Sequence, residues 1–126
     1  MGTRSLTFVY EGEKPIVNMY RQFDGYPSGH GVELAEFLTS FDEVVNGIPL
    51  GDKRKLANGM GCLAAQMIAN FKDSVGGFYI HSVDSTDCWQ DYEYHVYENK
   101  VVIKNPSEVI FEGDWEKFHS FCYDEE

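Results

Sequence analysis

Residues 92–111 read YEYHVYENKVVIKNPSEVIF, and this stretch decides the fold class. In its first segment every second residue is Tyr or Val, and this period of two is typical of a half-buried strand. Two further apolar segments, 101–103 and 109–111, each follow a polar turn that contains Asn. Short strands joined by tight turns pair as neighbours and run antiparallel. The stretch therefore predicts a three-stranded antiparallel meander.

The beginning of the chain predicts a hairpin. Residues 5–10 alternate in the same way, residues 11–14 form a turn, and residues 15–20 give a second strand. Pro15 suits the start of that strand, because Pro has no N–H group to donate to a sheet. Further along, Gly76 and Gly77 turn the chain into one more short buried strand at residues 78–80.

Between these strands two segments have the spacing of amphipathic helices. Leu34, Phe37, Leu38 and Phe41 recur at helical intervals, and the Gly and Pro of residues 46–49 are expected to end this helix.

A second apolar stripe runs from Leu56 to Phe71, with Asp52 as its expected N-cap. Gly59 and Gly61 lie within the stripe and leave open a later start, with Asn58 as the cap. Asp114 is expected to cap a short C-terminal helix.

This order of elements predicts an α+β protein. We expect an antiparallel sheet of about five or six strands with two main helices, a short C-terminal helix and a single layer of helices on the sheet. No linker or repeat divides the chain, so residues 1–126 are expected to form a single compact domain.

The charge excludes several classes of partner. The chain has 21 acidic and 10 basic residues, a formal net charge of −11, and only three Arg. Such a protein repels phosphate backbones and anionic membranes, so we expect no nucleic-acid partner and no membrane partner. The odd number of Cys residues, three, fits reduced thiols, and no apolar run is long enough to span a bilayer. We therefore expect a cytoplasmic protein.

Residues 21–31, RQFDGYPSGHG, are the strongest candidate for a ligand site. Their glycines allow close approach of a ligand to the backbone, and their N–H groups precede a helix, where anions bind favourably. Arg can hold a phosphate or carboxylate with two hydrogen bonds, and the aromatic rings can stack on a flat base. The ligand-binding residues expected are Tyr20, Arg21, Phe23, Asp24, Gly25, Tyr26, Ser28, Gly29, His30 and Gly31. An alternative interpretation is structural: the loop only joins a strand to a helix, with Arg21 paired to Asp24 or a nearby Glu.

The other motifs are weaker candidates for a binding or catalytic site. Residues 59–64 match the letters G-x-G-x-x-A, but a dinucleotide site requires a preceding strand, and residues 53–57 are expected to be helix or loop. The His and Cys residues lack metal-binding spacing, so we expect no metal, no cofactor and no assigned catalytic residue. A weaker enzymatic alternative pairs His30 or His95 with Asp24 in hydrolysis.

Four stretches resemble a family of small phage and bacterial proteins: residues 1–7 (MGTRSLT), 20–31 (YRQFDGYPSGHG), 58–66 (NGMGCLAAQ) and 89–94 (WQDYEY). Members of that family open with a similar M-G-T-R-S strand and carry a W/F-D-G-Y-P loop. The family brings no activity and no catalytic residues to this chain. The resemblance implies a phage accessory protein in the host cytoplasm. Such proteins often counter host defence, and one way is to sequester a nucleotide signal.

Three functional hypotheses follow. The first is a non-enzymatic protein that binds and sequesters a small anionic, nucleotide-derived signalling ligand, with homo-oligomers formed through Tyr79, Trp89 and Tyr97. The second is an acidic protein-interaction module, or nucleic-acid mimic, that inhibits a host protein. The third is a small nucleotide hydrolase.

Overall fold

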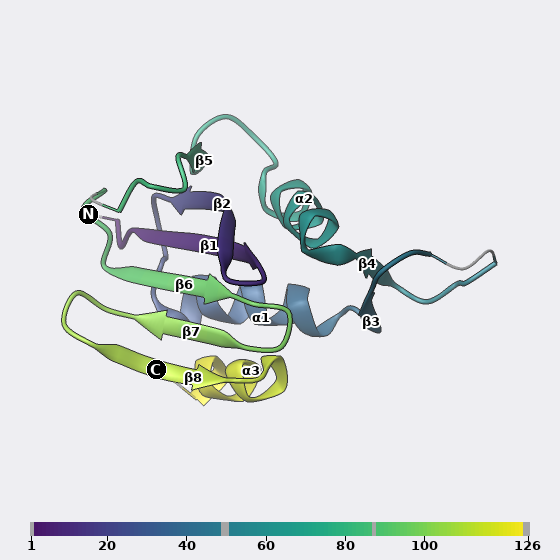
Figure 1. Ribbon diagram of the computed structural model, residues 1–126. Coiled ribbons are helices and arrows are strands. Elements are labelled where there is room, and N and C mark those ends of the chain that lie inside the picture. Colours follow the sequence, from purple (N-terminus) through teal and green to yellow (C-terminus); the bar gives the residue numbers. More distant parts are fainter. Residues whose placement is uncertain (1, 49–50, 87, 125–126) are drawn as a thin grey trace.

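The computed structural model describes residues 2–48, 51–86 and 88–124 (Figure 1). Its main feature is a six-stranded sheet in the order β5-β2-β1-β6-β7-β8, with a separate two-stranded sheet of β3 and β4. The strands are β1 (Ser5–Glu11), β2 (Lys14–Arg21), β3 (Glu43–Val45), β4 (Leu56–Asn58), β5 (Phe78–His81), β6 (Tyr92–Val96), β7 (Val101–Lys104) and β8 (Val109–Gly113). The helices are the short π-helical turn η1 (Pro27–Gly31), α1 (Val32–Thr39), α2 (Gly59–Phe71) and α3 (Trp115–Asp124).

Strand β1 lies at the centre of the large sheet and is buried on both faces. It pairs antiparallel with β2 through a tight turn at Gly12, whose φ of +64° favours Gly. On its other side it pairs parallel with β6, Ser5 opposite Tyr92. The remaining pairs of this sheet are antiparallel. The predicted hairpin and the predicted meander β6-β7-β8 are both confirmed.

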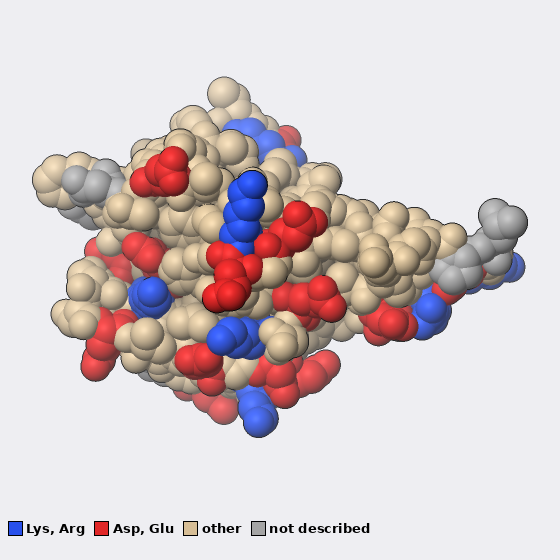
Figure 2. Space-filling view, in the orientation of Figure 1, with Lys and Arg blue, Asp and Glu red and all other residues tan. Residues whose placement is uncertain are grey.

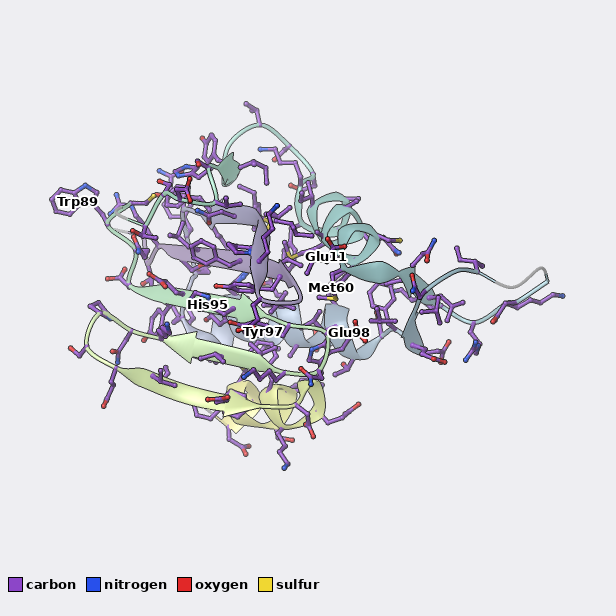
Figure 3. The ribbon with its side chains drawn as sticks, in the orientation of Figure 1. Glu11, Met60, Trp89, His95, Tyr97 and Glu98 are labelled. Atoms are coloured by element: carbon purple, nitrogen blue, oxygen red, sulfur yellow. The ribbon has the colours of Figure 1, made fainter. Side chains whose placement is uncertain are left out.

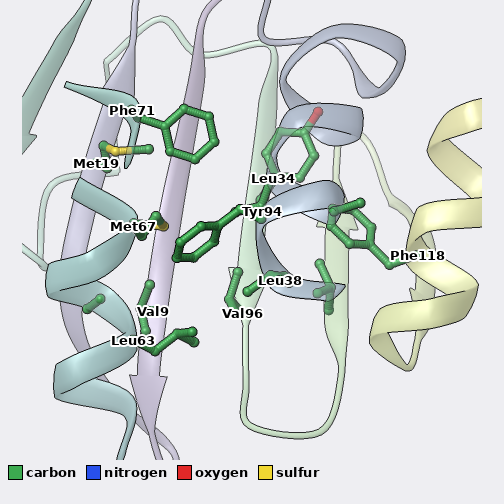
Figure 4. Packing of buried hydrophobic residues seen from close by; sticks show 14 of the residues in the cluster. Val9, Met19, Leu34, Leu38, Leu63, Met67, Phe71, Tyr94, Val96 and Phe118 are labelled. Carbon is green, nitrogen blue, oxygen red and sulfur yellow. The ribbon is translucent and has the colours of Figure 1, made fainter. Parts of the chain in front are cut away.

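The three α-helices lie in one layer over one face of the sheet (Figures 1 and 4). Between the helices and the sheet lies the main apolar core, because alternate strand residues and the apolar stripes of the helices meet there. The residues labelled in Figure 4 are Val9, Met19, Leu34, Leu38, Leu63, Met67, Phe71, Tyr94, Val96 and Phe118. The predicted α+β class and the single helical layer are therefore confirmed.

The opposite face of the sheet is covered in part by a loop and not by helices. It presents Leu6 and Phe8, both buried, together with a buried polar residue, Asn18, and several aromatic rings. The chain between β5 and β6 packs on this face, because the Asn18 amide donates to the carbonyl oxygens of Ser82 and Ser85, at 3.0 Å each. The sheet is thus covered in part on both sides.

The predicted course of residues 39–58 is wrong. Helix α1 ends at Thr39, before the expected stop signals at residues 46–49, of which Pro49 lies outside the described residues. A parallel pair of strands, β3 and β4, occupies part of this segment and projects from the body of the molecule (Figure 1).

Helix α2 begins at Gly59, after Asn58, which confirms the later of the two predicted starts. The expectation of helix or loop directly before it is wrong at Leu56 and Ala57, which belong to β4. Asp52 does not cap it. Its carboxylate instead accepts hydrogen bonds from Arg54.

Candidate functional site

A cavity of about 520 Å³ opens between α1, α2 and the edge strand β5. It is lined by Arg21, Glu33, Glu36, Phe37, Ser40, Lys55, Asn70, Phe71, Asp73 and Phe78. Its volume falls within the range of small-molecule sites, about 300 to 1,000 Å³. Phenylalanine rings and charged groups share its wall, so the cavity offers both an apolar surface and polar anchors.

Arg21 is the best-fixed charged group of this cavity. Its Nη1 donates to Glu33 Oε1 at 2.9 Å and to His30 Nδ1 at 3.2 Å. Its guanidinium carbon lies 4.9 Å from the centre of the Phe78 ring, and the side chain is only 12% exposed. Within the described residues Nη2 and Nε have no hydrogen-bond partner. One edge of the guanidinium is therefore held by the protein, while its other donors remain available to a ligand.

His30 holds Arg21 from behind. It is fully buried, and its Nε2 lies 2.7 Å from Thr7 Oγ1. Because Arg21 Nη1 can only donate, His30 Nδ1 must accept, so the ring proton lies on Nε2 and is donated to Thr7. Burial, reinforced by the Arg21 charge, lowers the pKa of His30 to about 3. The imidazole is therefore neutral and acts as a fixed acceptor for Arg21.

The second cation of the cavity, Lys55, comes from the segment that precedes β4. Its Nζ donates to Ser40 Oγ at 2.6 Å and lies 4.7 Å from the Phe41 ring centre. Two cations thus face three carboxylates among the lining residues, those of Glu33, Glu36 and Asp73. The cavity consequently carries one negative charge in excess, even though Arg21 offers an anion site within it.

The predicted ligand-binding residues of the loop do not lie together in the structure. Arg21 lines the cavity and His30 lies directly behind it. Tyr20, the neighbour of Arg21 on β2, points to the opposite face of the sheet and stacks on His81, with ring centres 5.0 Å apart. Phe23 is 54% exposed and, like Tyr26 and Ser28, does not line the cavity.

The glycines of the loop serve close packing in this structure. A Cβ on Gly25 would lie 2.8 Å from Ser5 Cβ, and one on Gly29 would lie 2.7 Å from the Asp24 carbonyl oxygen. The amides of Gly29 and Gly31 donate to the Tyr26 carbonyl and that of His30 to the Asp24 carbonyl. These three amides, which the sequence suggested as anion donors, are therefore already paired. The structural alternative is right that Arg21 pairs with a nearby Glu, namely Glu33.

Of the ten residues that line the cavity, only Arg21 was predicted from the sequence as a ligand-binding residue. Lys55, Asp73 and Phe78 lie far from the predicted loop in the sequence, and no motif links them to Arg21. Only the folding of α1, α2 and β5 around the end of β2 brings them together. No local sequence signal could have found this set.

A second cluster of polar side chains lies on the face of the sheet opposite the helices, around His95 (Figure 3). Tyr10 Oη donates to His95 Nδ1 at 2.6 Å, and His95 Nε2 donates to Glu93 Oε1 at 2.9 Å. The His95 hydrogen bond lowers the pKa of Glu93, and burial raises the pKa of Tyr10. Neither His95 nor His30 bonds to the Asp24 carboxylate, so the structure does not form the His–Asp pair of the hydrolase alternative.

The described residues contain no group of three or more His, Cys, Asp or Glu side chains placed to hold a metal ion. In the same parts of the chain, no helix is long and apolar enough to cross a membrane. Figure 2 shows Asp and Glu spread over the visible face with Lys and Arg among them. Comparisons with protein-family models, curated proteins and solved structures gave no match.

Proposed function

We propose that this protein binds, without chemical turnover, a small flat ligand of nucleotide size that carries a single negative charge. The observation that supports this most directly is the Arg21 guanidinium, which is fixed along one edge and has unpaired donors at a cavity of about 520 Å³. A guanidinium held in this way binds an anionic group with little loss of side-chain entropy.

The charge of the cavity restricts the ligand. Glu33, Glu36 and Asp73 would repel a polyphosphate, because three carboxylates outnumber Arg21 and Lys55 in a partly enclosed space. A monoanion with amino or hydroxyl donors avoids this repulsion and can use the carboxylates as acceptors. A cyclic mononucleotide has this chemistry: one phosphodiester charge, a ribose hydroxyl and a flat base with donor groups.

The apolar wall supports a flat ring in the ligand. Phe37, Phe71 and Phe78 line the cavity, and the rings of Phe71 and Phe78 lie with their centres 5.4 Å apart. Aromatic side chains favour stacked or edge contacts with a planar ring. Arg21 is itself packed on Phe78, so an anionic group on Arg21 would lie beside this wall.

The proposal is tested by calorimetric titration of the protein with cyclic AMP, AMP and ATP. We expect cyclic AMP to bind most tightly, Arg21→Ala to lose that binding, and Arg54→Ala to retain it. Arg54 is the matched control, because it too is ion-paired but lies on the projecting segment with Glu43 and Asp52.

Three results of the titration would contradict the proposal. These results are tightest binding for ATP, binding that survives in Arg21→Ala, and no binding heat with any of the three nucleotides.

If Arg21→Ala fails to fold, Lys55→Ala is a second variant for the same cavity, because Lys55 is exposed, and we expect it to weaken the binding of cyclic AMP. Mass spectrometry of the released nucleotide separates binding from hydrolysis: recovery of intact cyclic AMP supports sequestration, and AMP supports turnover.

The counter-defence role implied by the resemblance rests on this binding. A protein that retains a cyclic mononucleotide intact would lower the free concentration of such a signal in a cell. The same titration therefore tests the first requirement of that role.

A further inference from the structure

A thiol, an imidazole and a hydroxyl lie together on the side of the sheet away from the cavity. Cys88 Sγ lies 3.2 Å from His81 Nδ1 and 3.4 Å from Ser85 Oγ. His81 ends β5, while Ser85 and Cys88 belong to the connection that leads to β6. Cys88 as a whole residue is half-buried.

The surrounding contacts fix this cluster. Tyr20 stacks on the His81 ring with their centres 5.0 Å apart, which restrains the imidazole. The Cys88 amide donates to Gln90 Oε1 at 2.9 Å, and Gln90 Nε2 donates back to the Thr86 carbonyl at 2.7 Å. The sulfur and the ring nitrogen are therefore held against each other by contacts from both sides.

A buried amide beneath the connection is incompletely paired. Asn18, opposite His81 in the β2–β5 register, is fully buried. Its Nδ2 makes two hydrogen bonds to the connection, whereas its Oδ1 has no partner among the described residues. Buried acceptors without a donor are few in folded proteins, and a redox or catalytic role is one explanation for them. The open acceptor therefore lies under the same connection that presents the thiol.

We propose that Cys88 is a reactive thiol, activated by His81, that undergoes exchange with small disulfides. The Sγ proton passes to His81 Nδ1, and the sulfur electron pair attacks one sulfur of the disulfide. The disulfide bond breaks, the second sulfur leaves with the bonding electrons, and it then takes up the proton from His81. The products are a mixed disulfide on Cys88 and one free thiol.

The cluster favours a small, uncharged or cationic disulfide. Within the described residues Cys88 does not line the cavity at Arg21, and we expect a reagent to approach its sulfur from the surface. The net charge of −11 repels anionic reagents. Trp89, the next residue, is 84% exposed and projects from the molecule (Figure 3).

The test uses the neutral probe 2,2′-dithiodipyridine at neutral pH, with peptide mass spectrometry to measure the rate at each cysteine. Cys62 is an internal control: it is also half-buried, but its sulfur contacts the Gln66 amide and not an imidazole. We expect Cys88 to react at least about tenfold faster than Cys62, in line with the effect of a positioned general base.

His81→Asn provides the matching variant, because Asn keeps an acceptor near the position of Nδ1 but cannot take up a proton. We expect it to reduce the Cys88 rate to that of Cys62 and to leave Cys62 unchanged. His119→Asn, the same substitution on α3, should change neither rate.

Equal rates at Cys88 and Cys62 in the wild-type protein would overturn the proposal, whether or not the variant folds. A Cys88 rate that persists in a folded His81→Asn protein would overturn it as well. Neither result bears on the cavity at Arg21, which lies on the other side of the sheet.

Discussion

Acid should destabilise this protein through His30, whose neutral imidazole is enclosed between Thr7 and Arg21. Its pKa is about 3 in the folded protein and 6.5 in the unfolded reference. Between those values the unfolded chain binds one more proton than the folded protein, so the free energy of unfolding falls as the pH falls. The contribution is intact above the unfolded pKa and is lost progressively below it.

The size of the effect follows from the two pKa values. Each pH unit below 6.5 removes about 1.4 kcal/mol, so His30 alone should reduce the free energy of unfolding by about 2 kcal/mol at about pH 5.

The assay is guanidinium denaturation at about pH 7 and about pH 5, for the wild-type protein and for His30→Gln. Gln cannot be protonated but can still donate toward Thr7 Oγ1. We expect the variant to be less stable at pH 7 and to lose about 2 kcal/mol less than the wild type on acidification. The comparison cancels the groups that titrate in both proteins. An equal loss of stability in the two proteins would refute the argument that His30 is held neutral.

Two further predictions concern packing and one buried hydrogen bond. Gly31→Ala places a Cβ 2.7 Å from Cys122 Sγ and should cost about 1–3 kcal/mol. Gly61→Ala, with no described heavy atom outside its own helix within 4 Å, should instead stabilise by up to about 1 kcal/mol; the same sign for both, in denaturant titrations, would contradict this reading. Tyr94→Phe removes the 2.7 Å bond from Tyr94 Oη to the Gly25 carbonyl and should cost about 1–2 kcal/mol, whereas an unchanged denaturation midpoint would show that the bond contributes nothing.

The sequence by itself determined the fold class and most of the elements. The hairpin of β1 and β2, the meander β6-β7-β8 and the positions of α2 and α3 follow from apolar periods of two and of about 3.6 residues. These periods are local, because each depends only on which side chains of one segment face the core.

Only the tertiary structure decided which distant segments meet. The parallel pairing of β1 with β6 joins segments separated by about 80 residues. The strands β3 and β4 consist of residues that the sequence predicted to lie in two helices. Strand pairing depends on the partner as much as on the strand, so no local pattern specifies it. For the same reason the sequence offered Arg21 but not Lys55 or Asp73 as a site residue, and no sequence pattern links Cys88 to His81. Those sites exist because the chain, once its core is buried, fixes side chains from separate elements at hydrogen-bonding distance.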